Sequence, residues 1–221
     1  MYAAAAMNSH SLLEGLRYVI PLVLSLSVHE WAHAYSAYRL GDDTAARQGR
    51  LTLNPLAHID WVGSVLLPML GVPFGWAKPV PVNPNRFTRK VHMRTGMMIT
   101  AAAGPLANLA LALMCIIVLG VLLRLSAANE ATRELLALGF GMNIGLAVFN
   151  LLPIPPLDGS RIADWLMPRR LRPQWEQFVR IGPIALLVLV MVPPLRNVLL
   201  GWPIDQAQQL GLGILRAILG A

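Results

Sequence analysis

The chain carries few charged side chains for its length. Only 13% of its 221 residues are Asp, Glu, Lys or Arg, and 56% are hydrophobic, whereas a soluble domain averages about 25% charged residues. The apolar residues also come in long blocks. This composition argues against a water-soluble module and predicts an integral membrane protein.

Cysteine is nearly absent, since Cys115 is the only one. A single thiol excludes an internal disulfide and a Cys-rich zinc site, and its apolar surroundings predict a small buried hydrophobe. Acidic residues are also scarce, with 11 against 18 Lys and Arg, which gives a net charge of +7. The basic residues cluster in loops between apolar blocks, and no long polar face combines them with aromatic residues. We therefore expect a lipid bilayer and no nucleic acid as partner.

The apolar blocks predict an all-α polytopic membrane protein with about five to six transmembrane or re-entrant helices. We expect one membrane-embedded domain over 1–221, with its core at about 12–165 and C-terminal helices at about 181–221. The expected helices cover 12–40, 96–124, 133–152 and 181–200. Two further blocks are left open: 61–74, which is short and interrupted by Gly and Pro and favours a re-entrant hairpin, and the tail 201–221, which is interfacial or a short span.

Short strand-like segments are expected at the cytoplasmic membrane surface, at Arg50–Leu53 and around 75–85, and a basic loop at 161–180. The segments 75–95 and 158–180 carry most of the basic loop residues, so the positive-inside rule places them in the cytoplasm. His58 and His92 lie in loops and are expected to be ordinary surface or interfacial residues. We expect a protein of the plasma (inner) membrane with its active site toward the cytoplasmic side.

A His-Glu-x-x-His motif lies inside an otherwise apolar helix, at His29, Glu30 and His33. Positions i and i+4 share one face of a helix, so both imidazoles can reach one metal ion. Glu30 is offset by about 100° and can face a metal-bound water. Polar residues of this kind are costly in hydrocarbon, which favours a functional site over two packed histidines.

Catalytic zinc typically has three protein ligands and an open position for water. Among the few carboxylates of the chain, only Asp158 lies at the end of an apolar helix in a proline-constrained turn. The segment Pro153–Pro156 can unwind the helix and aim Asp158 inward. We therefore expect His29, His33 and Asp158 to hold one Zn²⁺ per chain.

Three segments resemble the site-2 protease family of intramembrane zinc metalloproteases: HEWAHAYSAYRLGD, AAAGPLANLALAL and FNLLPIPPLDGSRI. They occur in the family's order and span about residues 15–165. The resemblance also implies Asp158 as the third ligand, and it implies peptide-bond hydrolysis in or near transmembrane segments of substrate proteins. The chain looks like a minimal form of this family, without the PDZ or CBS domains of relatives.

The proposed chemistry is metal-assisted hydrolysis with Glu30 as the general base. Asn108, one turn after Gly104, is expected to support a ligand or the substrate backbone, and the family resemblance points to Asn150 for substrate or intermediate binding. A structural interhelical hydrogen bond is the alternative for both, and the favoured interpretation for Asn143. Two other functions stay open: a catalytically silent relative that binds membrane partners, and an ion transporter. The sequence leaves the substrate's identity and the oligomeric state undetermined.

Overall fold

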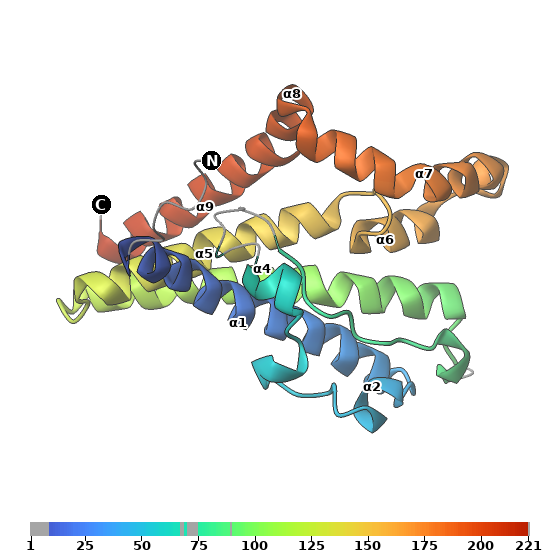
Figure 1. Cartoon of the computed structure of the whole chain (residues 1–221), viewed down its shortest axis with the longest axis horizontal. Coiled ribbons are helices and arrows are strands. Elements are labelled where there is room, and N and C mark those ends of the chain that lie inside the picture. The colour runs from blue at the N-terminus through green and yellow to red at the C-terminus, as the bar shows by residue number, and fades with distance from the viewer. Residues whose placement is uncertain (1–8, 67–68, 70–74, 89, 221) are drawn as a thin grey trace, which may run out of the picture.

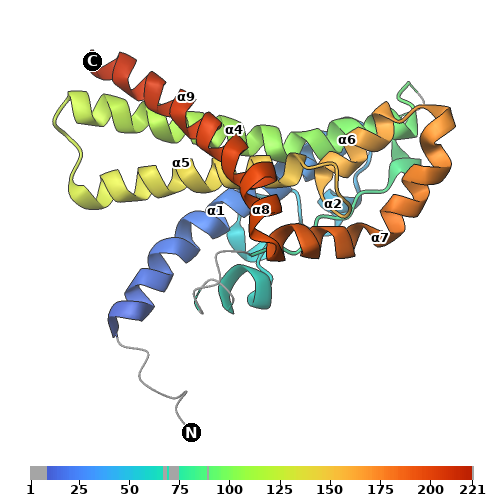
Figure 2. The same ribbon diagram turned by 90° about the horizontal axis from the view of Figure 1, so that it is seen from above.

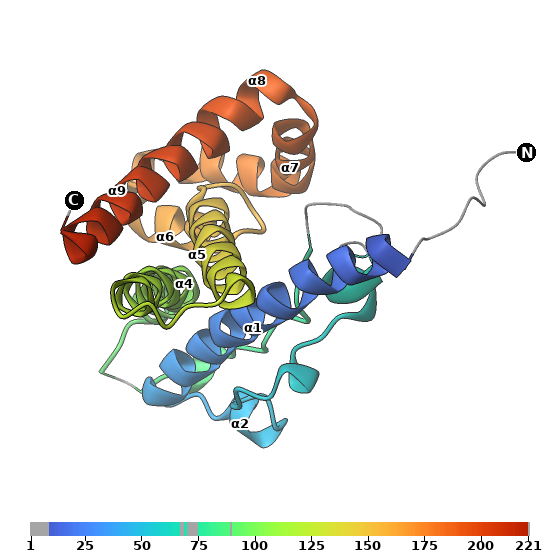
Figure 3. The same ribbon diagram turned by 90° about the vertical axis from the view of Figure 1, so that its left-hand side faces the viewer.

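In the computed structural model, which describes residues 9–66, 69, 75–88 and 90–220, α4 (Met93–Arg124) packs against α1 (Ser9–Arg39), α5 (Glu130–Leu151), α6 (Asp158–Leu166) and α9 (Trp202–Leu219). Figure 3 shows α4 and α5 between α1 and α2 on one side and α7 to α9 on the other. The remaining α-helices are α2 (Thr44–Arg47), α7 (Arg172–Met191) and α8 (Pro193–Arg196). Short 3-10 or π turns are η1 (Pro55–Ala57), η2 (Trp61–Leu66), η3 (Pro84–Arg86), η4 (Arg169–Leu171) and η5 (Asn197–Gly201).

Three stretches of the described chain are long and apolar enough to cross a membrane: α4, α5 and the segment Arg169–Met191 that contains α7. Helix α1 has 31 residues but is not among them. The described residues thus form a helical membrane protein with three candidate spans. The count of about five to six transmembrane or re-entrant helices stays a prediction. Most of the block 61–74 beyond Leu66 lies outside the described residues.

Helix boundaries follow local capping chemistry. Asn129 caps α5, because its Oδ1 accepts a hydrogen bond from the Thr132 N–H at 2.8 Å, and Glu130 in the first turn complements the helix dipole. Helix α7 ends at Met191, just before Pro193 and Pro194, which cannot continue a helix. The predicted helix 181–200 is therefore interrupted. The predicted loop 161–180 is wrong, since most of it is helical in α6 and α7.

The strand-like segments are not confirmed, because the described residues contain no strand. In 75–83 the reason is local: Pro79 and Pro81 lack an N–H, so a continuous ladder cannot form. The N–H groups of Val80 and Asn83 bind side chains instead, Val80 to Glu30 at 2.8 Å and Asn83 to Asp42 at 2.6 Å. We call residues 75–83 the strap.

The apolar core of the described chain lies between α4, α5 and α9, three helices that Figures 1 and 2 show lying together. Ile116 and Leu119 of α4 pack with Phe140 and Ile144 of α5. Gly211 lets α9 approach closely, since a Cβ there would lie 2.3 Å from Phe140 Cζ. Cys115 packs against this cluster as a partly buried hydrophobe.

Candidate metal centre

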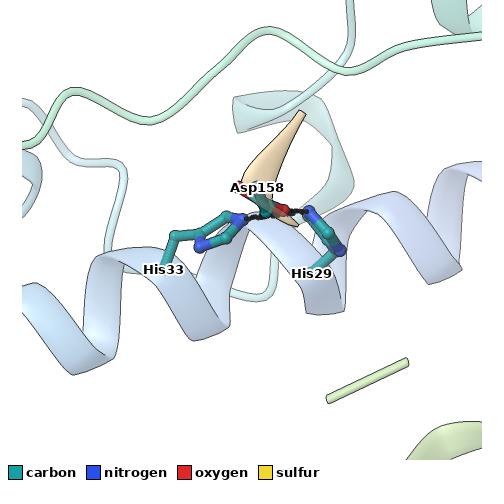
Figure 4. Close-up of side chains that lie close together, drawn as sticks. All are labelled: His29, His33 and Asp158. Carbon is teal, nitrogen blue, oxygen red and sulfur yellow. Dashed lines mark hydrogen bonds and ion pairs between the residues drawn. The ribbon is translucent and has the colours of Figure 1, made fainter. Parts of the chain in front are cut away.

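Helix α1 presents both motif histidines on one face. Their Nε2 atoms lie 2.9 Å apart, and His29 and His33 are only 5% and 9% exposed. Figure 4 shows both rings rising from the same helix toward Asp158, which approaches from a different element. The i and i+4 spacing therefore brings two nitrogen ligands to one point.

Asp158 comes from the first residue of α6, beyond the proline-rich turn that ends α5. Its Oδ2 lies 3.2 Å from each histidine Nε2. A carboxylate oxygen is one of the ligand types that zinc accepts beside imidazole nitrogens.

Helix α4 orients the two rings from behind. His29 Nδ1 lies 2.6 Å from Asn108 Oδ1, and His33 Nδ1 lies 2.7 Å from the backbone oxygen of Thr100. Because both partners are acceptors, each Nδ1 carries the proton and each Nε2 presents a lone pair. The two lone pairs point toward the same place as the Asp158 carboxylate.

A network of buried hydrogen bonds fixes the orientation of the Asn108 side-chain amide. Its Nδ2 donates to the Ser25 backbone oxygen at 3.2 Å and to Asn143 Oδ1 at 2.7 Å, so its Oδ1 must face His29. Asn143 in turn donates to Ser25 Oγ at 2.9 Å and to the Gly139 oxygen at 2.8 Å. Asn108 and Asn143 are 0% and 1% exposed. Helices α1, α4 and α5 thus share one chain of hydrogen bonds that ends on His29.

Gly104 permits the close approach of α4 to the histidines. A Cβ at this position would lie 2.4 Å from His33 Nε2 and 2.7 Å from His29 Cε1. Both distances are far below normal van der Waals contact, so any side chain here would displace the rings. The small residue is therefore a geometric requirement of the site.

Glu30 lies beside this centre and is held by the strap. Its Oε2 accepts the hydrogen bond from the Val80 N–H, and Glu30 is 9% exposed. The strap is itself anchored at both ends: Lys78 N–H donates to the His58 oxygen at 2.9 Å, and Asn83 N–H binds Asp42. One carboxylate oxygen of Glu30 is thereby fixed, while the other is not engaged by this bond.

The donor set fits a divalent metal ion. Asp158 Oδ2 is buried and makes no hydrogen bond within the part of the chain described, although two imidazole nitrogens face it. A tetrahedral zinc with ligands at about 2.0–2.1 Å separates its ligand atoms by about 3.3 Å. The observed separations of 2.9, 3.2 and 3.2 Å are close to that value. Three electron pairs converging on one point repel one another unless a cation lies between them, so the residues present can hold a metal.

The remaining sequence-predicted residues have mixed placements. Asn108 contacts His29, whereas the Nδ2 of Asn150 donates to the Leu146 oxygen of its own helix at 3.0 Å. The contacts described do not join Asn150 to the three ligands. His58, expected to be a surface or interfacial residue, is 1% exposed and binds the Thr52 oxygen at 2.8 Å beneath the strap.

Sequence reasoning also missed other contributors. Thr100 acts through its backbone oxygen, which no side-chain pattern reveals. Asn143, for which the sequence favours a structural interhelical hydrogen bond, forms such bonds with Asn108 and Ser25. The contact between Val80 and Glu30 joins backbone and side chain fifty positions apart.

Sequence comparison with known proteins places this chain in a family. The model of Peptidase family M50 matches residues 17–192. The chain is 43% identical over 195 residues to "Putative zinc metalloprotease YwhC" of Bacillus subtilis, covering 86% of this chain and 85% of that protein. It is 33% identical over 187 residues to "Putative zinc metalloprotease Rip2" of Mycobacterium tuberculosis, covering 81% and 67% respectively. No solved structure matches significantly.

The chain therefore belongs to peptidase family M50, and the resemblance to the site-2 proteases is confirmed.

Proposed function

We propose that the chain is an intramembrane zinc endopeptidase that hydrolyses peptide bonds in or near transmembrane segments of substrate proteins. The observation that carries the proposal is the convergence of His29, His33 and Asp158 beside Glu30, in a chain of a peptidase family. Two nitrogen ligands and one oxygen ligand suit a catalytic zinc with an open position. The names of the relatives agree with this metal.

The residues then take separate roles. Zinc, when bound, would lower the pKa of a water molecule and polarise the scissile carbonyl. Glu30 takes the proton of the attacking water and returns it to the leaving amine. The Val80 N–H holds one oxygen of this carboxylate and leaves the other for the proton. Asn108 positions His29, and Asn150 is assigned to support of the substrate or the intermediate.

The proposed location follows from charge. The segments 75–95 and 158–180 carry basic residues at one end of the apolar helices, which favours the cytoplasmic side of the plasma (inner) membrane. Asp158 and the strap both lie in these segments, so the site opens toward the cytoplasm and its water. Membrane-spanning proteins are the expected partners.

One experiment tests the proposal against its alternatives. The purified protein is assayed for bound zinc and for cleavage of a membrane-spanning test substrate, as wild type, Glu30→Gln and Asp158→Ala. Gln has the same shape and can still accept from the Val80 N–H, so Glu30→Gln should keep zinc but lose at least about a hundredfold in cleavage rate. Asp158→Ala should lose both. Glu134→Gln, an exposed residue of α5 paired with Arg17 at 3.5 Å, is the matched control and should retain both.

Two results would overturn the proposal. A silent binding relative shows no cleavage even in the wild type. An ion transporter moves an ion across liposomes, and its activity need not depend on bound zinc. If the Glu30→Gln variant cleaves the substrate at the wild-type rate, Glu30 is not the general base.

A further inference from the structure

A cavity of about 610 Å³ lies beside the turn that leads to Asp158, and the proposed hydrolysis does not use it. Its wall is formed by the Pro155–Pro156 turn, by α6 and by the first half of α7, which lie near each other in Figure 1. Arg161 of α6 and Arg172 and Arg180 of α7 line it. Three guanidinium groups from two helices therefore surround one hollow.

The spacing on α7 concentrates these charges. Residues 172, 176 and 180 are four positions apart, so they share one helix face. Arg161 and Arg180 form no ion pair or hydrogen bond among the residues that the structure describes. Glu176 lies between Arg172 and Arg180 on this face, but it forms no ion pair in the same set of residues. Arg161 and Arg180 are thus available to an external anion.

Asp164, the other acidic residue of the cavity wall, already accepts hydrogen bonds from neighbouring side chains. Its Oδ1 accepts from Trp175 Nε1 at 3.1 Å, and its Oδ2 accepts from Arg94 Nε at 3.2 Å. The Nη2 of Arg172 stays 3.8 Å from Oδ2, and it is buried with no hydrogen-bond partner in the described chain. A buried donor without an acceptor is costly, and a ligand oxygen in the cavity would satisfy it.

We propose that this cavity binds a phosphate group, with Arg161, Arg172 and Arg180 as its donors. Guanidinium groups match phosphate oxygens in a bidentate geometry, and several of them around one cavity suit a group with several acceptor oxygens. The cavity lies along the N-terminal half of the apolar segment Arg169–Met191, and the 41% exposed Trp165 follows Asp164 of the cavity wall in α6. Tryptophan and arginine at the end of a span mark the headgroup level, where basic pockets bind anionic lipids.

The test measures affinity for two phosphate sources. Native mass spectrometry in micelles gives the binding of dioleoyl phosphatidylglycerol, and calorimetry in phosphate-free buffer gives the binding of glycerol 1-phosphate. The test variant is Arg161→Gln with Arg180→Gln, because neither side chain forms an internal ion pair that the change would break. The matched control is Arg169→Gln with Arg170→Gln, which removes the same charge from exposed arginines of η4 outside the cavity wall.

The test variant should weaken binding by at least about tenfold per arginine removed, while the control stays near the wild type. Glu176→Gln should tighten binding, because it removes the one uncommitted negative charge of the wall. A loss seen only with phosphatidylglycerol supports a lipid headgroup, and a loss seen also or only with glycerol 1-phosphate supports a soluble phosphate compound. Equal losses in test variant and control would show general attraction to a basic surface and overturn the site, as would no binding of either probe to the wild type. Unchanged zinc content and cleavage rate in all variants would leave the proposed peptidase activity standing in either case.

Discussion

Replacing Gly104 by alanine should damage the metal centre without touching a ligand. The added Cβ would lie 2.4 Å from His33 Nε2, 2.6 Å from its Cε1 and 2.7 Å from His29 Cε1. The helix cannot retreat freely, because α4 also supplies Asn108 and the Thr100 oxygen that bind the two rings at 2.6 and 2.7 Å. Relief of the clash therefore breaks those hydrogen bonds or moves the rings.

The expected cost follows from these contacts. Overpacking of a well-filled site costs about 1–3 kcal/mol, and loss of the partners that orient metal ligands weakens metal binding about 10–100-fold. We expect Gly104→Ala to weaken zinc affinity by at least about tenfold, which corresponds to about 1.4 kcal/mol. Cleavage at limiting zinc should fall by a similar factor.

The assay is competition for zinc against a chelator of known affinity, with cleavage of a membrane-spanning substrate measured in parallel. Gly145→Ala on α5 is the control, because a Cβ there meets nothing within 4 Å and the gain in helix propensity is the same. Both variants should fold, and only Gly104→Ala should lose zinc. Equal zinc affinities in the two variants would refute the role given to Gly104.

Two further predictions concern the strap and the neighbouring surface. Val80→Pro removes the N–H that binds Glu30, so it should lower the cleavage rate while zinc is retained. Val82→Pro in the same segment is the control and should leave the cleavage rate unchanged. Equal cleavage rates in the two variants would contradict the role of the Val80–Glu30 bond. The Arg47 guanidinium, 2.7 Å from Asp43, lowers the pKa of that partly exposed carboxyl, so the pair stabilises the fold above the carboxyl's ordinary pKa and loses that effect as pH falls through the lowered value. Asp43→Asn should therefore lower the melting temperature near neutral pH but not in strong acid, and the same difference at both pH values would refute this.

The sequence predicts which side chains the structure brings together where their spacing is fixed by a helix. His29 and His33 meet because a helix repeats every 3.6 residues, and Asp158, which follows the proline-rich turn, reaches the same point. The long apolar helices were also predictable, with α4 and α5 beginning within three residues of their expected starts.

The remaining features depend on tertiary contacts that periodicity does not encode. The segment 161–180 seemed a basic loop, but Asp164 binds Arg94 and Trp175 and ties helices α6 and α7 to the start of α4. The strap resembled a strand by composition, yet its donors go to side chains. The roles of the Thr100 oxygen and Asn143 depend on which helices pack together, which a single sequence does not fix.

The prolines of the strap have an entropic consequence for the Glu30 carboxylate that Val80 binds. Pro79 and Pro81 fix φ on both sides of Val80 and narrow the conformations that this stretch samples before folding. Each such restriction typically contributes about 0.4–1 kcal/mol through the unfolded chain. The Val80 N–H that binds Glu30 therefore belongs to a segment that is already conformationally restricted. Alanine in place of either proline would increase the conformational entropy that the segment loses when this bond forms.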